Sequence, residues 1–160
     1  MTSLVGWPGI GALAVLGLDQ LTKWLVVKAW PIPNRDSLVV IPGFFSLVHW
    51  RNRGAAWGIL DNHTWLLAAV SLLAALALVV FFRKLTEGKP AYCLAYGFLL
   101  GGILGNFIDR AFFTEGVVDF LAFRWWPAFN VADSAITCSI VFLVVYGFFF
   151  ERRPDKTTGR

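Results

Sequence analysis

The sequence predicts an all-α integral membrane protein with four transmembrane helices and a small β-sheet outside the membrane. Of its 160 residues, 58% are hydrophobic and only 15% are charged, whereas a soluble domain is about 45–50% apolar and about 25% charged. Four apolar runs cover residues 9–27, 65–82, 91–107 and 133–150. Each run approaches the roughly 20 residues that cross a bilayer. The length suits a single membrane-embedded domain over residues 1–160.

The first apolar run is predicted to be a helix of the mature protein and not a cleaved signal peptide. The preceding residues, "MTSLVGWP", contain no Lys or Arg, so the positive region of a signal peptide is missing. The "ALA" at residues 12–14 is similar to a cleavage site. Too little apolar sequence precedes it for that role.

Basic residues predict the orientation of the helices. The 83–90 connection and the tail after Phe150 hold seven Lys or Arg in 18 positions, against six in 62 positions for segments 28–64 and 108–132. Cytoplasmic loops carry the excess of Lys and Arg. Both termini are therefore expected in the cytoplasm, with the two longer segments outside. This loop charge also accounts for the net charge of +4, and no basic stripe indicates a nucleic-acid partner.

The two outer segments are predicted to form short strands that rest on the outer membrane surface. Segment 28–64 is rich in β-branched and aromatic residues, with breaks at Pro42, Gly43 and Gly54. Segment 108–132 has the same character and carries Trp125 and Trp126. Indole rings favour membrane interfaces.

The third run carries glycines at spacing four, Gly97, Gly101 and Gly105, with Gly102 beside them. Such a face permits close approach of a neighbouring helix. Cys93 and Cys138 are expected at different membrane depths. A disulfide between them is therefore not expected.

Charged residues inside apolar runs are candidates for function because burying them costs at least about 2.5–3.5 kcal/mol each. The first run contains Asp19 and Lys23, which are four residues apart and share a helix face. Their main role is expected to be a structural ion pair, with organisation of a nearby site and direct catalysis as the alternatives. The third run ends in "GNFIDR", where Asn106, Asp109 and Arg110 cluster on one side of the last turn. Arg110 suits a carboxylate, a lipid phosphate or a backbone carbonyl.

Two aspartates flank the start of the fourth run. Asn130 is a good N-cap for this helix, and Asp133 follows in the first turn, where the helix dipole favours the ionised form. Asp119 lies among Val117, Val118 and Phe120, where burial would favour the protonated form. Capping alone for Asp133, and a solvated loop position for Asp119, are the simpler alternatives.

All these polar residues are expected near the outer membrane face, and this convergence predicts one polar site. Two carboxylates in unequal environments can share a proton and activate a water. One takes a proton from the water, and the other protonates the scissile carbonyl. Asp133 is the expected ionised partner and Asp119 the acid. This chemistry uses no metal and no cofactor. Ser134 with Lys23 is a weaker alternative, and a zinc set of His and Cys is missing.

Five sequence blocks resemble, in this order, those of bacterial lipoprotein signal peptidase (signal peptidase II): "DQLTKW", "NRGAAWG", "GGILGNFIDR", "VVDF" and "FNVADSA". The resemblance covers nearly the whole chain. Trp57 replaces a residue that is often Phe in that family, which is a conservative change.

The resemblance implies an aspartyl endopeptidase of the bacterial inner membrane that acts near the periplasmic face. It would remove signal peptides from diacylglyceryl-modified prolipoproteins by cutting just before the lipidated cysteine. The implied catalytic pair is Asp119 and Asp133. The implied supporting residues are Asn52, Asn106, Asp109, Arg110, Asn130, Asp19 and Lys23. The implied fold adds a periplasmic β-cradle and loop to the four helices, and the Gly-flanked 52–58 turn is a candidate lid over the bound peptide.

Two other functions fit parts of the pattern. A small proton-coupled membrane transporter could use Asp19, Lys23 and Asp109 as a relay, although the polar residues do not continue to the inner face. A non-catalytic membrane scaffold would use the glycine face. The expected partners are lipid-modified signal peptides and membrane lipids.

Overall fold

The structure is a computed structural model that describes residues 6–54, 60 and 63–150. Its helices are α1 (Trp7–Ala29), α2 (Thr64–Thr86), α3 (Pro90–Phe112) and α4 (Val131–Phe150). Its strands are β1 (Ser37–Ile41), β2 (Phe45–Asn52), β3 (Val117–Phe123) and β4 (Trp126–Phe129). Within the described residues, these four helices are long and apolar enough to cross a membrane. The predicted combination of four such helices and a small sheet is confirmed.

Each helix is longer than its apolar run. The third run was expected to end at residue 107, but α3 continues to Phe112. The fourth was expected to start at residue 133, but α4 starts at Val131. The outer segments are correspondingly shorter than 28–64 and 108–132. Hydrophobicity marks only the part of a helix in hydrocarbon, whereas backbone hydrogen bonding favours continuing the helix into the polar interface.

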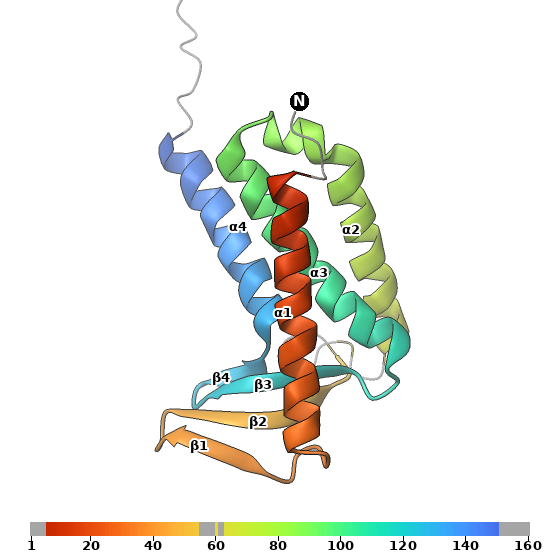
Figure 1. Ribbon diagram of the computed structural model, residues 1–160, viewed down its shortest axis with the longest axis vertical. Coiled ribbons are helices and arrows are strands. Elements are labelled where there is room, and N and C mark those ends of the chain that lie inside the picture. The colour runs from red at the N-terminus through yellow and green to blue at the C-terminus, as the bar shows by residue number, and fades with distance from the viewer. Residues whose placement is uncertain (1–5, 55–59, 61–62, 151–160) are drawn as a thin grey trace, which may run out of the picture.

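Local sequence explains where the helices begin and end. Pro8 lies in the first turn of α1 and Pro90 begins α3, positions where the missing N–H of proline is not needed. After α2, Glu87 and Gly88 adopt left-handed backbone angles, with φ of 49° and 72°. Such residues end a helix. The short turn that follows makes α2 and α3 antiparallel neighbours (Figure 1).

Helix α3 lies at the centre of the bundle and contacts the other three helices. Its glycines make these contacts close. A Cβ on Gly97 or Gly101 would lie 2.3 or 2.5 Å from a backbone oxygen of α1, and one on Gly102 would lie 2.6 Å from the carbonyl oxygen of Ala132 in α4. The glycine face therefore packs as expected, and it serves two neighbours. Cys93 and Cys138 are free thiols.

The strands form one antiparallel sheet in the order β1-β2-β3-β4. It lies across one end of the bundle, away from the start of α1 and the end of α4 (Figure 1). The central pair joins the two outer segments, with Trp50 opposite Asp119 and Asn52 opposite Val117. One small core, built around Val26 of α1 with Val118 and Phe120 of β3, attaches the sheet to the helices.

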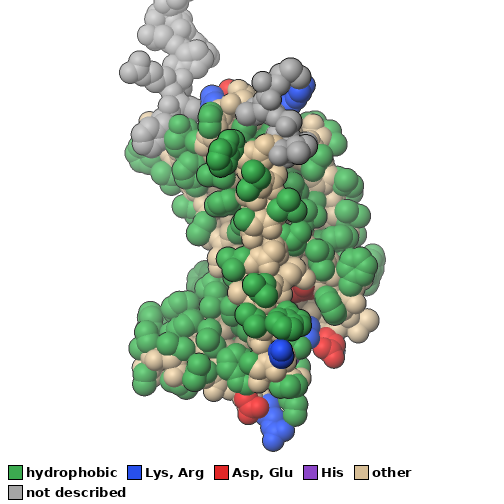
Figure 2. All heavy atoms as spheres, in the orientation of Figure 1, with side chains coloured by type: hydrophobic (Ala, Val, Ile, Leu, Met, Phe, Trp, Pro, Cys, Tyr) green, Lys and Arg blue, Asp and Glu red, His purple; other side chains and the backbone are tan. Residues whose placement is uncertain are grey.

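The surface of the bundle is largely hydrophobic. Figure 2 shows apolar side chains over the middle of this face, with most charged side chains toward the two ends. The same view shows a hollow between the helices and the projecting sheet. Helix α2 has a mean hydropathy of 2.7 and α4 of 1.9 over their apolar windows, so hydrocarbon suits their exposed faces.

Candidate active site

Asp133 lies in the first turn of α4, where Asn130 caps the helix. The N–H of Asp133 donates to Asn130 Oδ1 at 2.9 Å, and the N–H of Asn130 donates back to Asp133 Oδ2 at 3.2 Å. This reciprocal pair resembles a capping box. The predicted cap is confirmed, and it also fixes the position of the Asp133 carboxylate.

Asp119 lies on β3 and is not the solvated loop acid of the simpler alternative, since only 1% of it is exposed. Its Oδ1 accepts a hydrogen bond from Asn130 Nδ2 at 2.8 Å, and its Oδ2 accepts one from Asn52 Nδ2 at 2.9 Å. Burial raises the pKa of Asp119 to about 7, and the nearby Asp133 carboxylate contributes to the rise. The two amide donors act in the opposite direction and lower the pKa.

Asn130 connects the two aspartates. Its side-chain amide donates to Asp119, while its backbone N–H donates to Asp133. Both aspartates also line one cavity of about 1150 Å³ between the sheet and the N-terminal part of α4. The fold thus brings together two acids that are 14 positions apart in the sequence. A carboxylate pair on a shared cavity is the arrangement that can hold a water between them.

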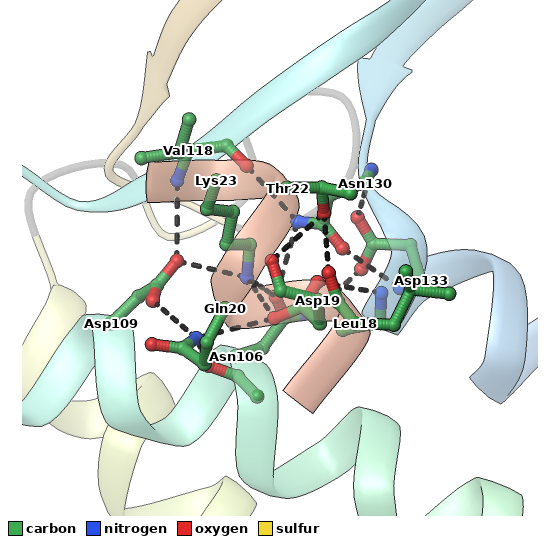
Figure 3. A network of polar contacts seen from close by, with 12 residues as sticks. Leu18, Asp19, Gln20, Thr22, Lys23, Asn106, Asp109, Val118, Asn130 and Asp133 are labelled. Carbon is green, nitrogen blue, oxygen red and sulfur yellow. Dashed lines mark hydrogen bonds and ion pairs between the residues drawn. The ribbon is translucent and has the colours of Figure 1, made fainter. Parts of the chain in front are cut away.

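A buried ion cluster lies behind Asp133 (Figure 3). Lys23 Nζ is 2.8 Å from Asp19 Oδ2 and 2.9 Å from Asp109 Oδ2. All three side chains are at most 5% exposed. The predicted pair of Asp19 and Lys23 therefore exists and gains a second carboxylate from α3. Among the residues that the structure describes, no group of three or more His, Cys, Asp or Glu could hold a metal.

The cluster is joined to the aspartate pair along two routes, one through Ala132 and one through Asn106. Asp19 Oδ1 accepts the backbone N–H of Ala132, one residue before Asp133, at 2.8 Å. Lys23 donates to Asn106 Oδ1 at 3.1 Å, and Asn106 Nδ2 donates to Asp133 Oδ1 at 2.7 Å. Asp19 and Lys23 lie in α1, whereas Asp119 lies in β3 and Asp133 in α4, so only the folded protein makes these contacts.

Arg110 differs from the other candidates. It lies on α3 and lines the cavity with Asp119, Asp133 and Asn52. Its Nε is buried without a hydrogen-bond partner. Across the described ranges, no carboxylate or carbonyl of the chain pairs with Arg110. Its guanidinium is therefore positioned to bind an acceptor from outside the chain.

Two polar residues near the site were not predicted from the sequence. Gln20 donates to Asp109 Oδ1 at 3.0 Å and to the carbonyl of Gly105 at 3.2 Å. Its position beside Asp19 in an apolar run was a usable signal. His49 is 1% exposed, lines the cavity and donates from Nδ1 to the carbonyl of Trp30 at 2.6 Å. Nothing in its local sequence indicates this burial.

The wall of the cavity around the aspartates is mixed in character. One part of the wall is polar and consists of Arg110 and the side chains at the C-terminal end of β2. The other part is apolar and comes from β4 and the first turns of α4, including Phe129 and Ile136. A ligand with both apolar and hydrogen-bonding groups suits such a cavity. Of the 52–58 turn, residues 55–58, including Trp57, lie outside the described residues.

Comparisons with known proteins identify one family over nearly the whole chain. The model of the family described as signal peptidase (SPase) II matches residues 11–149. A lipoprotein signal peptidase of Listeria monocytogenes serotype 4a (strain HCC23) is 41% identical over 151 residues, which cover 92% of this chain and 94% of that protein. One of Geobacillus kaustophilus (strain HTA426) is 41% identical over 149 residues, covering 91% and 94%.

Two solved structures, both described as a bacterial membrane enzyme studied by the in meso method, have the same fold. One, at 2.3 Å resolution, has a TM-score of 0.81 and 32% identity and covers 94% of each chain. The other, at 1.9 Å resolution, has a TM-score of 0.78 and 34% identity and covers 92% of this chain and 96% of its own. The chain therefore belongs to the signal peptidase II family of multi-pass bacterial membrane proteases, the lipoprotein signal peptidases.

Proposed function

We propose that this protein is an aspartyl endopeptidase that removes the signal peptide from diacylglyceryl-modified prolipoproteins, cutting just before the lipidated cysteine. The observation that carries the proposal is the bridge at Asn130, which holds both Asp119 and Asp133 on one cavity. The name shared by the relatives, lipoprotein signal peptidase, supports the substrate class. The mixed walls of the cavity suit a peptide that carries lipid.

The unequal surroundings of the two acids support their roles. Asp119 has a pKa raised to about 7 by burial, so a large fraction is protonated at neutral pH. Asp133 receives two donors, from Asn106 Nδ2 and the N–H of Asn130, and it lies at a helix N-terminus. These donors hold its carboxylate in place on the cavity, and we assign to it the role of proton acceptor.

The reaction then needs only one water and the two side chains. Asp133 accepts a proton from the water while the oxygen of that water attacks the scissile carbonyl carbon, and Asp119 protonates the carbonyl oxygen. The tetrahedral intermediate collapses when Asp133 passes its proton to the leaving nitrogen. Asp119 recovers its proton from the intermediate as the new carboxyl group forms. Both acids end in their starting states, and one water is consumed.

The placement of the site supports an active site near the periplasmic face of the inner membrane. The sheet and both aspartates lie at one end of the bundle. The α2–α3 connection lies at the other end (Figure 1), where Arg83 and Lys84 belong to the last turn of α2 and Lys89 caps α3. Basic residues favour the cytoplasmic side. This orientation puts both termini in the cytoplasm, and a signal peptide that crosses the membrane would present its cleavage site at the sheet.

The transporter alternative draws less support. A proton path would need ionisable or polar groups across the bilayer. Among the described residues, the buried acidic, basic and histidine side chains all belong to the sheet end: Asp19, Lys23, His49, Asp109 and Asp119. Toward the other end, the buried side chains with polar atoms are Thr86, Ser139, Tyr92 and Cys93, and none of these is Asp, Glu, Lys, Arg or His.

The test is cleavage of a diacylglyceryl-modified prolipoprotein by the purified protein in lipid bicelles. We expect release of the signal peptide by the unmodified protein and none above background by Asp119→Asn or Asp133→Asn. Glu115→Gln is the matched control, because this carboxylate lies in the same outer segment but is 62% exposed. Equal melting temperatures would show that the variants fold. Cleavage that survives in either aspartate variant would refute the proposal, and solute flux in proteoliposomes without cleavage would favour a transporter.

A further inference from the structure

The ammonium group of Lys23 uses all of its hydrogen-bonding capacity inside the protein. It has three N–H donors and no acceptor, and it has three acceptors around it: Asp19 Oδ2 at 2.8 Å, Asp109 Oδ2 at 2.9 Å and Asn106 Oδ1 at 3.1 Å. Lys23 is 4% exposed and does not belong to the cavity wall. It therefore contacts neither water in the cavity nor a substrate bound there.

This arrangement determines which way the amide of Asn106 faces. A group that only donates must face the amide oxygen, because two opposed N–H groups repel. Asn130 Nδ2 donates to the same Oδ1 at 3.1 Å and reinforces this orientation. The NH₂ group of Asn106 is thereby directed to Asp133 Oδ1 at 2.7 Å, as Figure 3 shows. A rotated amide would present its oxygen to Asp133 and could be accommodated only if that carboxyl carried a proton.

We propose that Lys23 is a positioning residue that acts through the Asn106 amide to keep Asp133 ionised for the reaction. This inference rests on the proposed function and extends it from the two aspartates to a buried cation in α1. Lys23 makes the donor orientation of Asn106 permanent, and Asn106 stabilises the negative charge that accepts a proton from water. The ion cluster is then more than a structural ion pair between helices.

Other charged groups also face Asp133 and must be separated from this effect. Asp119 lies across the cavity on β3, and Arg110 approaches from α3. The cluster itself contributes Asp19 from α1 and Asp109 from α3. Removing Lys23 alone would change both the Asn106 orientation and the local charge, and it would leave two buried carboxylates without their partner.

A charge-balanced double variant, Lys23→Met with Asp109→Asn, separates the two effects. The formal charge of the cluster is −1 before the change, from two carboxylates and one ammonium, and −1 after it, from Asp19 alone. A purely electrostatic role for Lys23 therefore predicts no change in the pH profile. The positioning role predicts that the Asn106 amide, which is then oriented by Asn130 alone, spends part of its time with its oxygen toward Asp133, an orientation that only a protonated Asp133 accommodates.

The measurement is the pH dependence of kcat and of kcat/KM for cleavage of a lipidated prolipoprotein in bicelles. We expect the acid limb of the double variant to move to higher pH and kcat to fall on the order of 10- to 100-fold, as is typical when a supporting hydrogen bond is lost. We expect KM to stay within about twofold, because neither Lys23 nor Asn106 lines the cavity. Thermal unfolding of the same preparation shows that it is folded.

Asp109→Asn alone is the matched control, since Lys23 can still donate to Asn106 while one negative charge is gone. Its acid limb should stay at or below the pH of the unmodified protein. The positioning role is overturned if the acid limb of the double variant lies at the same pH as that of the unmodified protein. It is also overturned if the fall in kcat/KM comes from a higher KM and not from a lower kcat. The proposed function would still hold in that case, provided that the unmodified protein cleaves the prolipoprotein and the two aspartate variants do not. An inactive unmodified protein would instead remove the proposed function itself.

Discussion

Asp133 is held by the helical bundle and Asp119 by the sheet, and the two supports differ in kind. Around Asp133, α1, α3 and α4 approach closely at glycines, and a buried ion cluster fills the space behind the carboxylate. Around Asp119, the support is the β2–β3 pair and two amide donors, Asn52 and Asn130. Close packing of the helix backbones therefore fixes the position of Asp133, whereas the side chain of Asp119 is positioned mainly by hydrogen bonds from two amide side chains.

This difference indicates which acid is the adjustable one. Interhelical packing at glycines resists displacement because interiors have few voids. A sheet-borne side chain held by amides can move when a neighbouring strand moves. Asn52 is the last residue of β2, so one of the two amide donors to Asp119 lies at the end of a strand. We therefore expect the sheet half of the site to respond to substrate and the helix half to remain fixed.

The largest effect is expected from Gly116→Ala at the start of β3. Gly116 has a φ of +92°, and a Cβ there would lie 2.4 Å from the carbonyl oxygen of Asn52. Overpacking costs roughly 1–3 kcal/mol, and the unfavourable φ adds roughly 1–3 kcal/mol. A fall in melting temperature and loss of cleavage are expected. Gly88→Ala is the control, because its φ is +72° with nothing within 4 Å; an equal fall there would mean that the contact with Asn52 does not matter.

Gly105→Ala tests the helix half of the site. The added Cβ would lie 2.6 Å from Asp19 Oδ2 and 3.2 Å from the Cβ of Ala132. We expect about 1–3 kcal/mol of lost stability and slower cleavage, since Asp19 holds the backbone N–H just before Asp133. Circular dichroism melts and kcat in the same detergent check this. Unchanged kcat at reduced stability would argue against a link between this packing and Asp133.

The pH profile tests the assignment of Asp119 as the acid. Its pKa is raised to about 7, and the reaction needs its protonated form. The rate should therefore be highest below about pH 7 and should fall about tenfold per unit above it. Initial rates across the neutral range, with protein stability followed in parallel, provide the measurement. A rate that rises through pH 7 would exclude a protonated Asp119 from the mechanism.

Asn52→Ala sharpens the same assignment with a smaller effect. Asn52 donates to Asp119 Oδ2 at 2.9 Å and lowers the Asp119 pKa. Its removal should raise that pKa further, so the basic limb should move to higher pH, with a modest loss of kcat from poorer positioning. The comparison is made on kcat profiles of both proteins. Movement of the limb to lower pH would contradict the assigned hydrogen bond.

The smallest effect is expected at Gly17 in α1, which has nothing within 4 Å of an added Cβ. Alanine favours a helix by about 0.8–1.0 kcal/mol over glycine in soluble hosts. Gly17→Ala should therefore leave cleavage unchanged and raise the melting temperature slightly. Gly17 lies in α1 two positions before Asp19. Gly17→Ala is therefore also a control for Gly105→Ala, because it adds the same methyl group near Asp19 without a close contact. A destabilised Gly17→Ala protein would show that α1 needs flexibility there.

The helices were predictable because hydrophobicity alone reports where a chain enters hydrocarbon. Their ends were not, since α3 runs five residues beyond residue 107 on backbone hydrogen bonding that composition does not reveal. The cap at Asn130 was also predictable, because it is a local pattern over four residues. Gln20 was overlooked beside a stronger neighbour, Asp19, although its position in an apolar run carries the same signal.

The sequence by itself determined four membrane-length helices, a capped α4 and a set of polar residues too costly to bury without a purpose. It also suggested the pairing of Asp19 with Lys23, because residues four apart share a helix face. These features depend on composition and on neighbours within one or two helical turns. They can be predicted without knowing how the helices are arranged.

Only the tertiary structure decided which distant groups meet. Asn130 joins Asp119 to Asp133, and Asp109 supplies a second carboxylate to Lys23. Asp19 accepts the N–H of Ala132, which is 113 residues away in the sequence. Such contacts depend on how closely α1, α3 and α4 approach and on the register of β2 against β3. Those quantities are set by packing between elements, and no local pattern in a single chain encodes them.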